Sequence, residues 1–212
     1  MDKSERAKKI VSMLDKAYPD APSTYLMYEN SYELLIATIL SARATDAGVN
    51  KVTPILFARY PTPGKLGVAK LEDVADIIRP LGAYNKKAEY ITETARALAE
   101  DFRGEVPGRM DDLVTFKGVS RKTANVILSV AFNLSEGIVV DTHVGRVSFR
   151  LGLSEHEKKP DKIEKDLMDL LPKNLWNNYA RLIGAHGRRI CKSQRPNCPG
   201  CSVNSLCPSA GI

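Results

Sequence analysis

The sequence lacks an apolar run that could span a membrane. Its most apolar stretch, residues 34–40, is interrupted by Thr38 and falls well short of the ~20 residues that a transmembrane helix needs. The first nine residues are polar and lack the apolar segment of a signal peptide. We therefore expect a cytoplasmic protein with no membrane partner.

The sequence also lacks segments in which apolar and polar residues alternate over the length of a β-strand. Helical periodicity of the apolar residues dominates instead. Asp2 and Glu5 are predicted to form a capping box at the first helix. Pro63 and five further prolines fall between the periodic segments, where proline is tolerated. The sequence thus predicts an all-α fold, with helices at 2–17, 31–42, 45–57, 71–78, 85–102, 110–116, 120–132, 142–150, 161–171 and 174–190.

Positively charged residues are in modest excess over negatively charged ones. The 212 residues include 31 Lys and Arg against 25 Asp and Glu, which gives a net charge of +6 and a pI near 9.1. Such a balance permits a polyanionic partner, and it equally fits a solvated surface with surplus lysine. The length suits one domain or two modest ones.

Cysteine is absent from the first 190 residues and then occurs four times, at Cys191, Cys198, Cys201 and Cys207. Two disulfides would need an oxidising compartment. A zinc site usually joins two short chelating pairs, and this run has one C-x2-C pair and no histidine. A [4Fe–4S] cluster needs four thiolates from a compact loop, and the prolines between these cysteines can bend the chain. The ligand rules favour the cluster.

The stretch FKGVSRKTAN at 116–125 predicts a helix, a tight turn and a second helix. Gly118 permits the turn and Ser120 caps the second helix. Arg121 and Lys122 then occupy the first helical turn, where the helix dipole disfavours cations. Backbone N–H groups beside a basic pair form a suitable binding site for a phosphate, although the side chains of Arg121 and Lys122 could simply be solvated.

The stretch VVDTHVGR places Asp141 immediately before another predicted helix. Taken alone, Asp141 is best explained as an N-cap. Paired with Lys122 on an adjoining element, it gains a second interpretation. An amine at a helix N-terminus beside another cation can serve as a nucleophile, and a nearby carboxylate can take a proton or stabilise a developing cation.

These residues resemble the endonuclease III family, which are DNA glycosylases of the helix-hairpin-helix superfamily with a Gly-Pro-Asp signature. The similarity extends over nearly the whole chain in collinear order. The matching stretches are LLIATILSARATD (34–46), YNKKAEYI (84–91), EVP (105–107), FKGVSRKTANVIL (116–128), VVDTHVGRV (139–147), HGRRIC (186–191) and the cysteine run.

The resemblance implies a two-lobed protein. One lobe, 22–134, is a six-helix barrel that ends in the hairpin. The other combines 1–21 with 135–212 and holds a [4Fe–4S] cluster on the four cysteines. The partner is double-stranded DNA that contains damaged bases or abasic sites, with the damaged base flipped out of the stack. The simplest expectation is a monomer associated with the nucleoid.

The implied activity is that of a bifunctional DNA glycosylase and AP lyase of base excision repair, which removes oxidised pyrimidines. Lys122 matches the family's nucleophile, which attacks the sugar C1′ and forms a Schiff base. Asp141 matches the catalytic carboxylate. The Schiff base then allows β-elimination, which nicks the strand 3′ to the lesion.

Several expected DNA contacts lie where the sequence departs from the family pattern. Ser120 stands where the hairpin often has Gly, and Arg43 replaces the usual Gln in the segment that fills the gap left by the flipped base. Ala83 replaces a larger apolar wedge, so Arg43 or Leu81 is expected to do more of that filling. The full set of predicted DNA contacts is Arg43, Leu81, Ala83, Gly118, Ser120, Arg121, Lys192 and Arg195.

Three rival functions fit the residues less well. An adenine-removing mismatch glycosylase would have Glu at position 39, which is Ile39 here, a residue other than lysine at 122, and a further domain after the cysteines. A thymine-mismatch glycosylase typically lacks Lys122. A non-catalytic DNA-binding module would explain Gly118 and the basic charge, but not the pair of Lys122 and Asp141.

Overall fold

The computed structural model describes residues 1–211, and within that range every regular element is helical: eleven α-helices, two short 3₁₀ helices and no β-strand. The predicted all-α fold is confirmed. No helix in the described part of the chain is long and apolar enough to cross a membrane.

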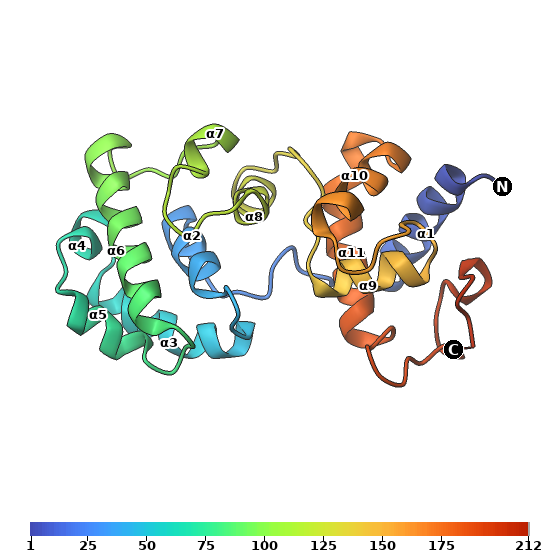
Figure 1. The fold of residues 1–212 in the computed structure, drawn as a ribbon, viewed down its shortest axis with the longest axis horizontal. Coiled ribbons are helices and arrows are strands. Elements are labelled where there is room, and N and C mark those ends of the chain that lie inside the picture. Colours follow the sequence, from blue (N-terminus) through green and yellow to red (C-terminus); the bar gives the residue numbers. More distant parts are fainter. Residues whose placement is uncertain (212) are drawn as a thin grey trace. The chain divides into compact units, whose positions relative to one another are not determined.

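The chain divides into two compact units, which Figure 1 shows with their helices labelled. The terminal unit consists of residues 1–24 and the chain from Ser135 onward; the central unit consists of residues 25–134. The terminal unit contains α1 (Lys3–Ala17), α9 (Thr142–Arg150), α10 (Pro160–Leu170), η1 (Lys173–Leu175), α11 (Trp176–Arg189) and η2 (Asn204–Leu206). The central unit contains α2 (Ser31–Leu40), α3 (Asp46–Arg59), α4 (Pro63–Gly67), α5 (Leu71–Ile78), α6 (Tyr84–Asp101), α7 (Met110–Leu113) and α8 (Arg121–Ala131).

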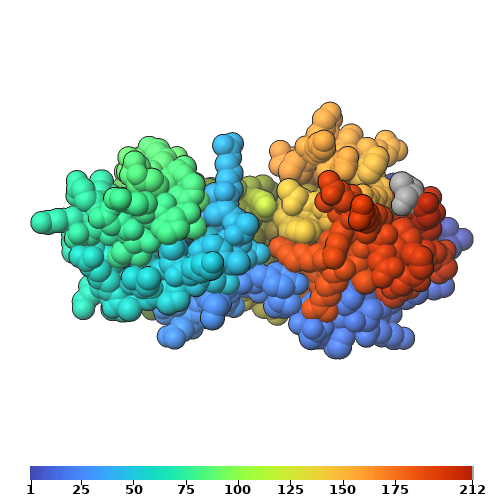
Figure 2. All heavy atoms as spheres, turned by 90° about the horizontal axis from the view of Figure 1, so that it is seen from below, coloured from blue at the N-terminus to red at the C-terminus, as the bar shows by residue number. Residues whose placement is uncertain are grey.

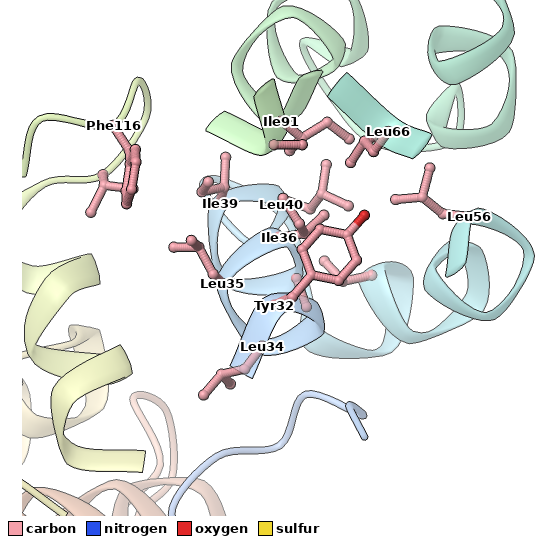
Figure 3. Close-up of a cluster of buried hydrophobic side chains, with 14 of the residues drawn as sticks. Tyr32, Leu34, Leu35, Ile36, Ile39, Leu40, Leu56, Leu66, Ile91 and Phe116 are labelled. Atoms are coloured by element: carbon pink, nitrogen blue, oxygen red, sulfur yellow. The ribbon is translucent and has the colours of Figure 1, made fainter. Parts of the chain in front are cut away.

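The central unit is built around α2, which is mostly apolar and is buried on all its faces. Every residue from Tyr32 to Leu40 is buried, and α3, α6 and α8 all pack against this helix. Figure 3 shows side chains leaving α2 toward Leu56, Leu66 and Ile91 on one flank and Phe116 on another. A helix that is hydrophobic all round must be enclosed, so α2 fixes where its neighbours lie.

Helix boundaries follow the sequence pattern with a few differences. The short helix α4 was not predicted, because Pro63 was interpreted as part of a linker. Pro63 is instead the first helical residue, where its missing N–H costs no hydrogen bond, and the Thr62 hydroxyl accepts from the Lys65 N–H at 3.4 Å. Residues 110–116 were predicted as one helix, but α7 ends at Leu113 and a tight turn follows.

The terminal unit is held together by α1 at the start of the chain. The predicted capping box is confirmed, since the Asp2 carboxylate accepts from the Glu5 N–H at 2.7 Å and the Glu5 carboxylate accepts from the Asp2 N–H at 3.3 Å. Arg6 then donates to the carbonyls of Leu206 at 3.0 Å and Gly152 at 3.2 Å. Helix α1 and the C-terminal segment therefore lie side by side, as Figure 2 shows in blue and red.

The close approach of α4 to α6 depends on Gly67. A Cβ added to Gly67 would lie 2.8 Å from the Arg96 Cα and 2.9 Å from the Arg96 N, which are backbone atoms that cannot move aside. We predict that Gly67→Ala lowers the free energy of unfolding by about 1–3 kcal/mol, as overpacking does, in urea titrations. Gly64→Ala in the same helix is the control, since its Cβ would meet nothing within 4 Å. An equal loss in both variants would contradict this account.

Candidate functional site

The turn between α7 and α8 is closed by local hydrogen bonds and by contacts with two other helices. The Val119 N–H donates to the Phe116 carbonyl at 3.1 Å, and both side chains are buried. Gly118 has a φ of +80°, which favours glycine. A Cβ there would lie 2.8 Å from the Tyr90 ring and 3.2 Å from Ile39, so the turn is pressed against α6 and α2.

This turn sets the start of α8, where the candidate nucleophile lies. Ser120 is the N-cap, and its hydroxyl accepts from the Thr123 N–H at 3.3 Å, as the sequence predicts. Arg121 and Lys122 are the first two residues of α8 and both are exposed. Within the central unit, no described residue forms a hydrogen bond or ion pair with the Lys122 side chain. The amine is therefore accessible at the positive end of a helix dipole.

Two further turns of the central unit carry predicted DNA contacts. Arg43 follows the end of α2 and Ala83 precedes α6; both are exposed, and their φ values are 53° and 56°. Non-glycine residues rarely adopt this left-handed conformation, and when they do it is often at functional turns. Leu81 differs, because its side chain is only 3% exposed and belongs to the core of the unit. In this conformation Leu81 has no surface to offer to DNA.

Asp141 lies in the terminal unit as the N-cap of α9. Its Oδ1 accepts the backbone N–H groups of His143 at 2.9 Å and Val144 at 2.7 Å, which confirms the cap that the sequence predicts. Its Oδ2 lies 3.6 Å from Nη2 of Arg188 on α11. Lys122 and Asp141 thus belong to different units of the chain.

Helices α9 and α11 approach closely beside Asp141 because Gly187 has no side chain. A Cβ on Gly187 would lie 2.9 Å from the His143 Cβ. Burial lowers the pKa of His143, so this ring is neutral at neutral pH. Arg146 donates to the Gly187 carbonyl at 2.9 Å and to the Cys191 carbonyl at 2.9 Å. The guanidinium of Arg146 thus fastens the end of α11 to α9.

All four cysteines line one hollow in the terminal unit. Each thiol is half-buried, and each is free rather than in a disulfide. Disulfides, the alternative that the ligand rules did not favour, have no support in this geometry. No three His, Cys, Asp or Glu side chains among residues 1–211 converge on a position for a single metal ion.

The hollow that the thiols line also contains apolar side chains together with His186 and Arg150. Burial raises the pKa of the Cys201 and Cys207 thiols, so without metal they keep their protons at neutral pH. His186 lies 3.6 Å from the Cys201 sulfur, and its other ring nitrogen pairs with the Tyr18 hydroxyl at 2.7 Å. Burial lowers the pKa of His186 to about 4, so its ring is neutral.

Arg150 anchors the loop between the first two cysteines. Its guanidinium lies 3.5 Å from the Cys191 sulfur and donates to the carbonyls of Lys192 at 2.7 Å and Ser193 at 3.0 Å. The side chain of Arg195, further along this loop, is exposed, and its backbone has a φ of 51°. Arg150 therefore fixes the base of a loop whose two predicted DNA-binding cations face solvent.

Comparisons with known proteins agree with this geometry. The family model for the HhH-GPD superfamily base excision DNA repair proteins matches residues 36–173. Endonuclease III of Synechocystis sp. is 46% identical over 98% of this chain and 94% of its own length, and that of Bacillus subtilis is 43% identical over 94% and 92%. A solved structure of a trapped endonuclease III–DNA covalent intermediate superimposes with a TM-score of 0.91 at 41% identity, covering 99% of this chain and 98% of that one.

The chain belongs to the endonuclease III family. Members of this family are base excision repair enzymes with DNA N-glycosylase and AP lyase activity, and the helical fold agrees with that of the solved structures. The resemblance noted from the sequence is confirmed. A thermostable thymine-DNA glycosylase also superimposes, with a TM-score of 0.85, but at 22% identity it supports the fold alone.

Sequence reasoning missed three side chains of this endonuclease III fold. Arg150, Arg188 and Tyr18 were not singled out, although each touches a predicted site residue or its immediate neighbour. Their partners lie between 41 and 168 residues away in the sequence, so no local pattern links them. The available signal for Arg188 was its place in the matching stretch HGRRIC (186–191).

The hairpin turn predicts a matched pair of substitutions. Gly118→Ala adds a Cβ at positive φ that also clashes with Tyr90, whereas Gly104→Ala adds one at a φ of +81° with nothing within 4 Å. We expect Gly118→Ala to lower the free energy of unfolding by more than the roughly 1 kcal/mol of conformational strain expected for Gly104→Ala. Chemical denaturation of both variants measures this, and equal costs would show that the contact with α6 is not tight.

Proposed function

We propose that Lys122 is the nucleophile of this bifunctional DNA glycosylase and AP lyase, and that oxidised pyrimidines in duplex DNA are the substrates. The Lys122 amine attacks C1′ of the damaged nucleotide while the bond from C1′ to the base breaks. Loss of the ring oxygen's bond to C1′ gives a Schiff base. Removal of a 2′ proton then expels the 3′ phosphate, which nicks the strand and leaves the sugar on the enzyme until hydrolysis.

One observation carries this proposal: the exposed Lys122 amine lies at the open N-terminus of α8 without an ion-pair partner in its own unit. A structural lysine would gain more from a carboxylate partner, as Lys117 does with Glu93 at 2.8 Å in the same hairpin. The solved relative named a trapped covalent intermediate with DNA supports the same chemistry. Asp141 supplies the carboxylate that assists departure of the base and transfer of the proton.

The hairpin also supplies contacts to the DNA backbone. The N–H groups around Gly118 and Ser120 and the charge of Arg121 suit a phosphate. Arg43 and Ala83, on two exposed turns of the same unit, are proposed to fill the gap left by the flipped base. Leu81 is not included, because it is enclosed in the core.

We further propose that the four cysteines hold a [4Fe–4S] cluster. The four thiols line one hollow, and their sequence spacing has one short chelating pair rather than the two pairs of a usual zinc site. When bound, the cluster supplies four metal–thiolate bonds that replace the thiol protons and fix the loop. Lys192 and Arg195 would then be held as phosphate contacts.

The two units take the corresponding roles in this proposal. The central unit is the barrel lobe with the helix-hairpin-helix, predicted at 22–134, and the terminal unit is the cluster lobe, predicted at 1–21 with 135–212. The enzyme is proposed to act as a monomer on duplex DNA of the nucleoid. The alternative of a mismatch-specific enzyme or a non-catalytic DNA-binding module has no specific support in the geometry.

Substitution of the proposed nucleophile tests the reaction directly. Lys122→Gln removes the amine without changing the length of the hairpin, so we expect loss of base release and strand nicking with DNA binding retained. Borohydride trapping on duplexes with thymine glycol or an abasic site is the measurement. Lys117→Gln, in the same hairpin, is the control and should still give the adduct. A trapped adduct of undiminished yield in Lys122→Gln would refute the assignment.

Substitution in the cysteine loop tests the proposed phosphate contacts. Arg195→Ala should weaken binding to damaged and intact DNA alike and reduce the slope of log K against log salt by about 0.9, the value for one phosphate contact. Arg103→Ala is the matched control, because Arg103 is also exposed, with a φ of 55°. Arg103 follows the C-terminal end of α6, whereas Ala83 precedes the N-terminal end. An unchanged slope in Arg195→Ala would count against the contact.

A further inference from the structure

The two carboxylate oxygens of Asp141 have different surroundings. Oδ1 is occupied as a helix cap by the N–H groups of His143 and Val144. Oδ2 forms an ion pair with Arg188 Nη2 at 3.6 Å and accepts no hydrogen bond from the described residues. That separation is longer than a hydrogen bond of 2.7–3.2 Å, so the guanidinium acts on Oδ2 by charge while leaving its lone pairs open.

The position of Arg188 depends on two glycines of α11. Gly187 lets the helix approach α9, since a Cβ there would lie 2.9 Å from the His143 Cβ. Gly184 lies one turn earlier, and a Cβ there would come within 3.3 Å of Arg188 Nη1. The same Nη1 donates to the Gly184 carbonyl at 3.4 Å. The guanidinium is therefore held between its own helix and Asp141, with its side chain 32% exposed.

The other charged groups around Asp141 cannot replace Arg188. On α9, His143 is neutral at neutral pH because burial lowers its pKa. Arg146, also on α9, is committed to the carbonyls of Gly187 and Cys191. Arg188 on α11 is thus the cation whose guanidinium forms an ion pair with Asp141.

We propose that Arg188 is a positioning residue of the glycosylase reaction, which holds Oδ2 of Asp141 in a fixed orientation toward the substrate while Oδ1 remains the helix cap. The inference rests on the proposed catalytic role of Asp141. With one oxygen tied to the backbone and the other oriented by charge, the carboxylate cannot rotate freely. Preorganisation of this kind acts on the transition state more than on binding of the DNA.

Single-turnover kinetics on a thymine glycol duplex test the proposal. We expect Arg188→Gln to lower the rate constant of base release about 10- to 100-fold, the range for a misplaced catalytic group, and to leave the Kd for DNA within about twofold. Arg188→Lys keeps the charge and should recover most of the rate. Arg189→Gln is the control, because Arg189 is the next residue on α11 and its printed partners are Asp20, at 2.9 Å, and the Tyr18 ring. Its rate should equal that of the parent enzyme.

A readout independent of activity is the NMR titration of His143. Burial is the main cause of the lowered pKa of His143. The Asp141 carboxylate opposes it, and the charges of Arg188 and Arg146 lower the pKa further. Arg188→Gln should therefore raise the pKa of His143, whereas Arg188→Lys and Arg189→Gln should leave it unchanged. An unmoved His143 pKa in Arg188→Gln would show that the guanidinium does not lie where the inference needs it.

Asp141→Asn separates this inference from the proposed function. We expect Asp141→Asn to lose base release and expect Arg188→Gln to add nothing to that loss, since the two residues act as one unit. A fully active Asp141→Asn would overturn the catalytic role of Asp141 and the inference with it. Loss of activity in Asp141→Asn but not in Arg188→Gln would overturn the inference alone. A Kd that rises in Arg188→Gln while the rate constant holds would identify a phosphate contact instead and would also overturn it.

Discussion

The turn at Gly118 packs against the Tyr90 ring and the Ile39 side chain, and the placement of the proposed nucleophile depends on that contact. Ile39 belongs to α2, a helix that is buried along its length, so the turn rests on a closely packed part of the central unit. The same turn places Ser120 at the N-cap of α8. Lys122 follows two residues later, exposed at the positive end of the helix. A cation in that position is unfavourable for the helix alone, which is the signature of a functional compromise.

The terminal unit has an apolar core of its own, and arginines add hydrogen bonds that tie its segments together. Arg6, Arg146 and Arg150 each donate to backbone carbonyls that lie far away in the sequence, and these carbonyls belong to the segments around the cysteines. A guanidinium presents five donors in a rigid fork and suits this task better than lysine. The outcome is a cysteine segment whose ends are tied to α1 and α9.

The sequence predicts local features well and long-range pairings poorly. Helix periods, the capping box at Asp2 and the N-caps Ser120 and Asp141 were predicted, because each depends on residues no more than a few positions apart. The burial of Leu81 was not, since a leucine beside a turn has the same local pattern whether it faces the core or the surface. The pairing of Arg188 with Asp141 joins residues on two helices, and a single sequence holds no periodic signal for it.

The central claim is that the amine of Lys122 forms the bond to deoxyribose. Its most direct test is to reduce the enzyme–DNA adduct of the parent protein with borohydride, digest it, and locate the modified peptide by mass spectrometry. The account predicts that the sugar remnant is attached to Lys122, in the peptide that begins the helix after Gly118. A remnant on another lysine or on the N-terminal amine, with Lys122 unmodified, would contradict it.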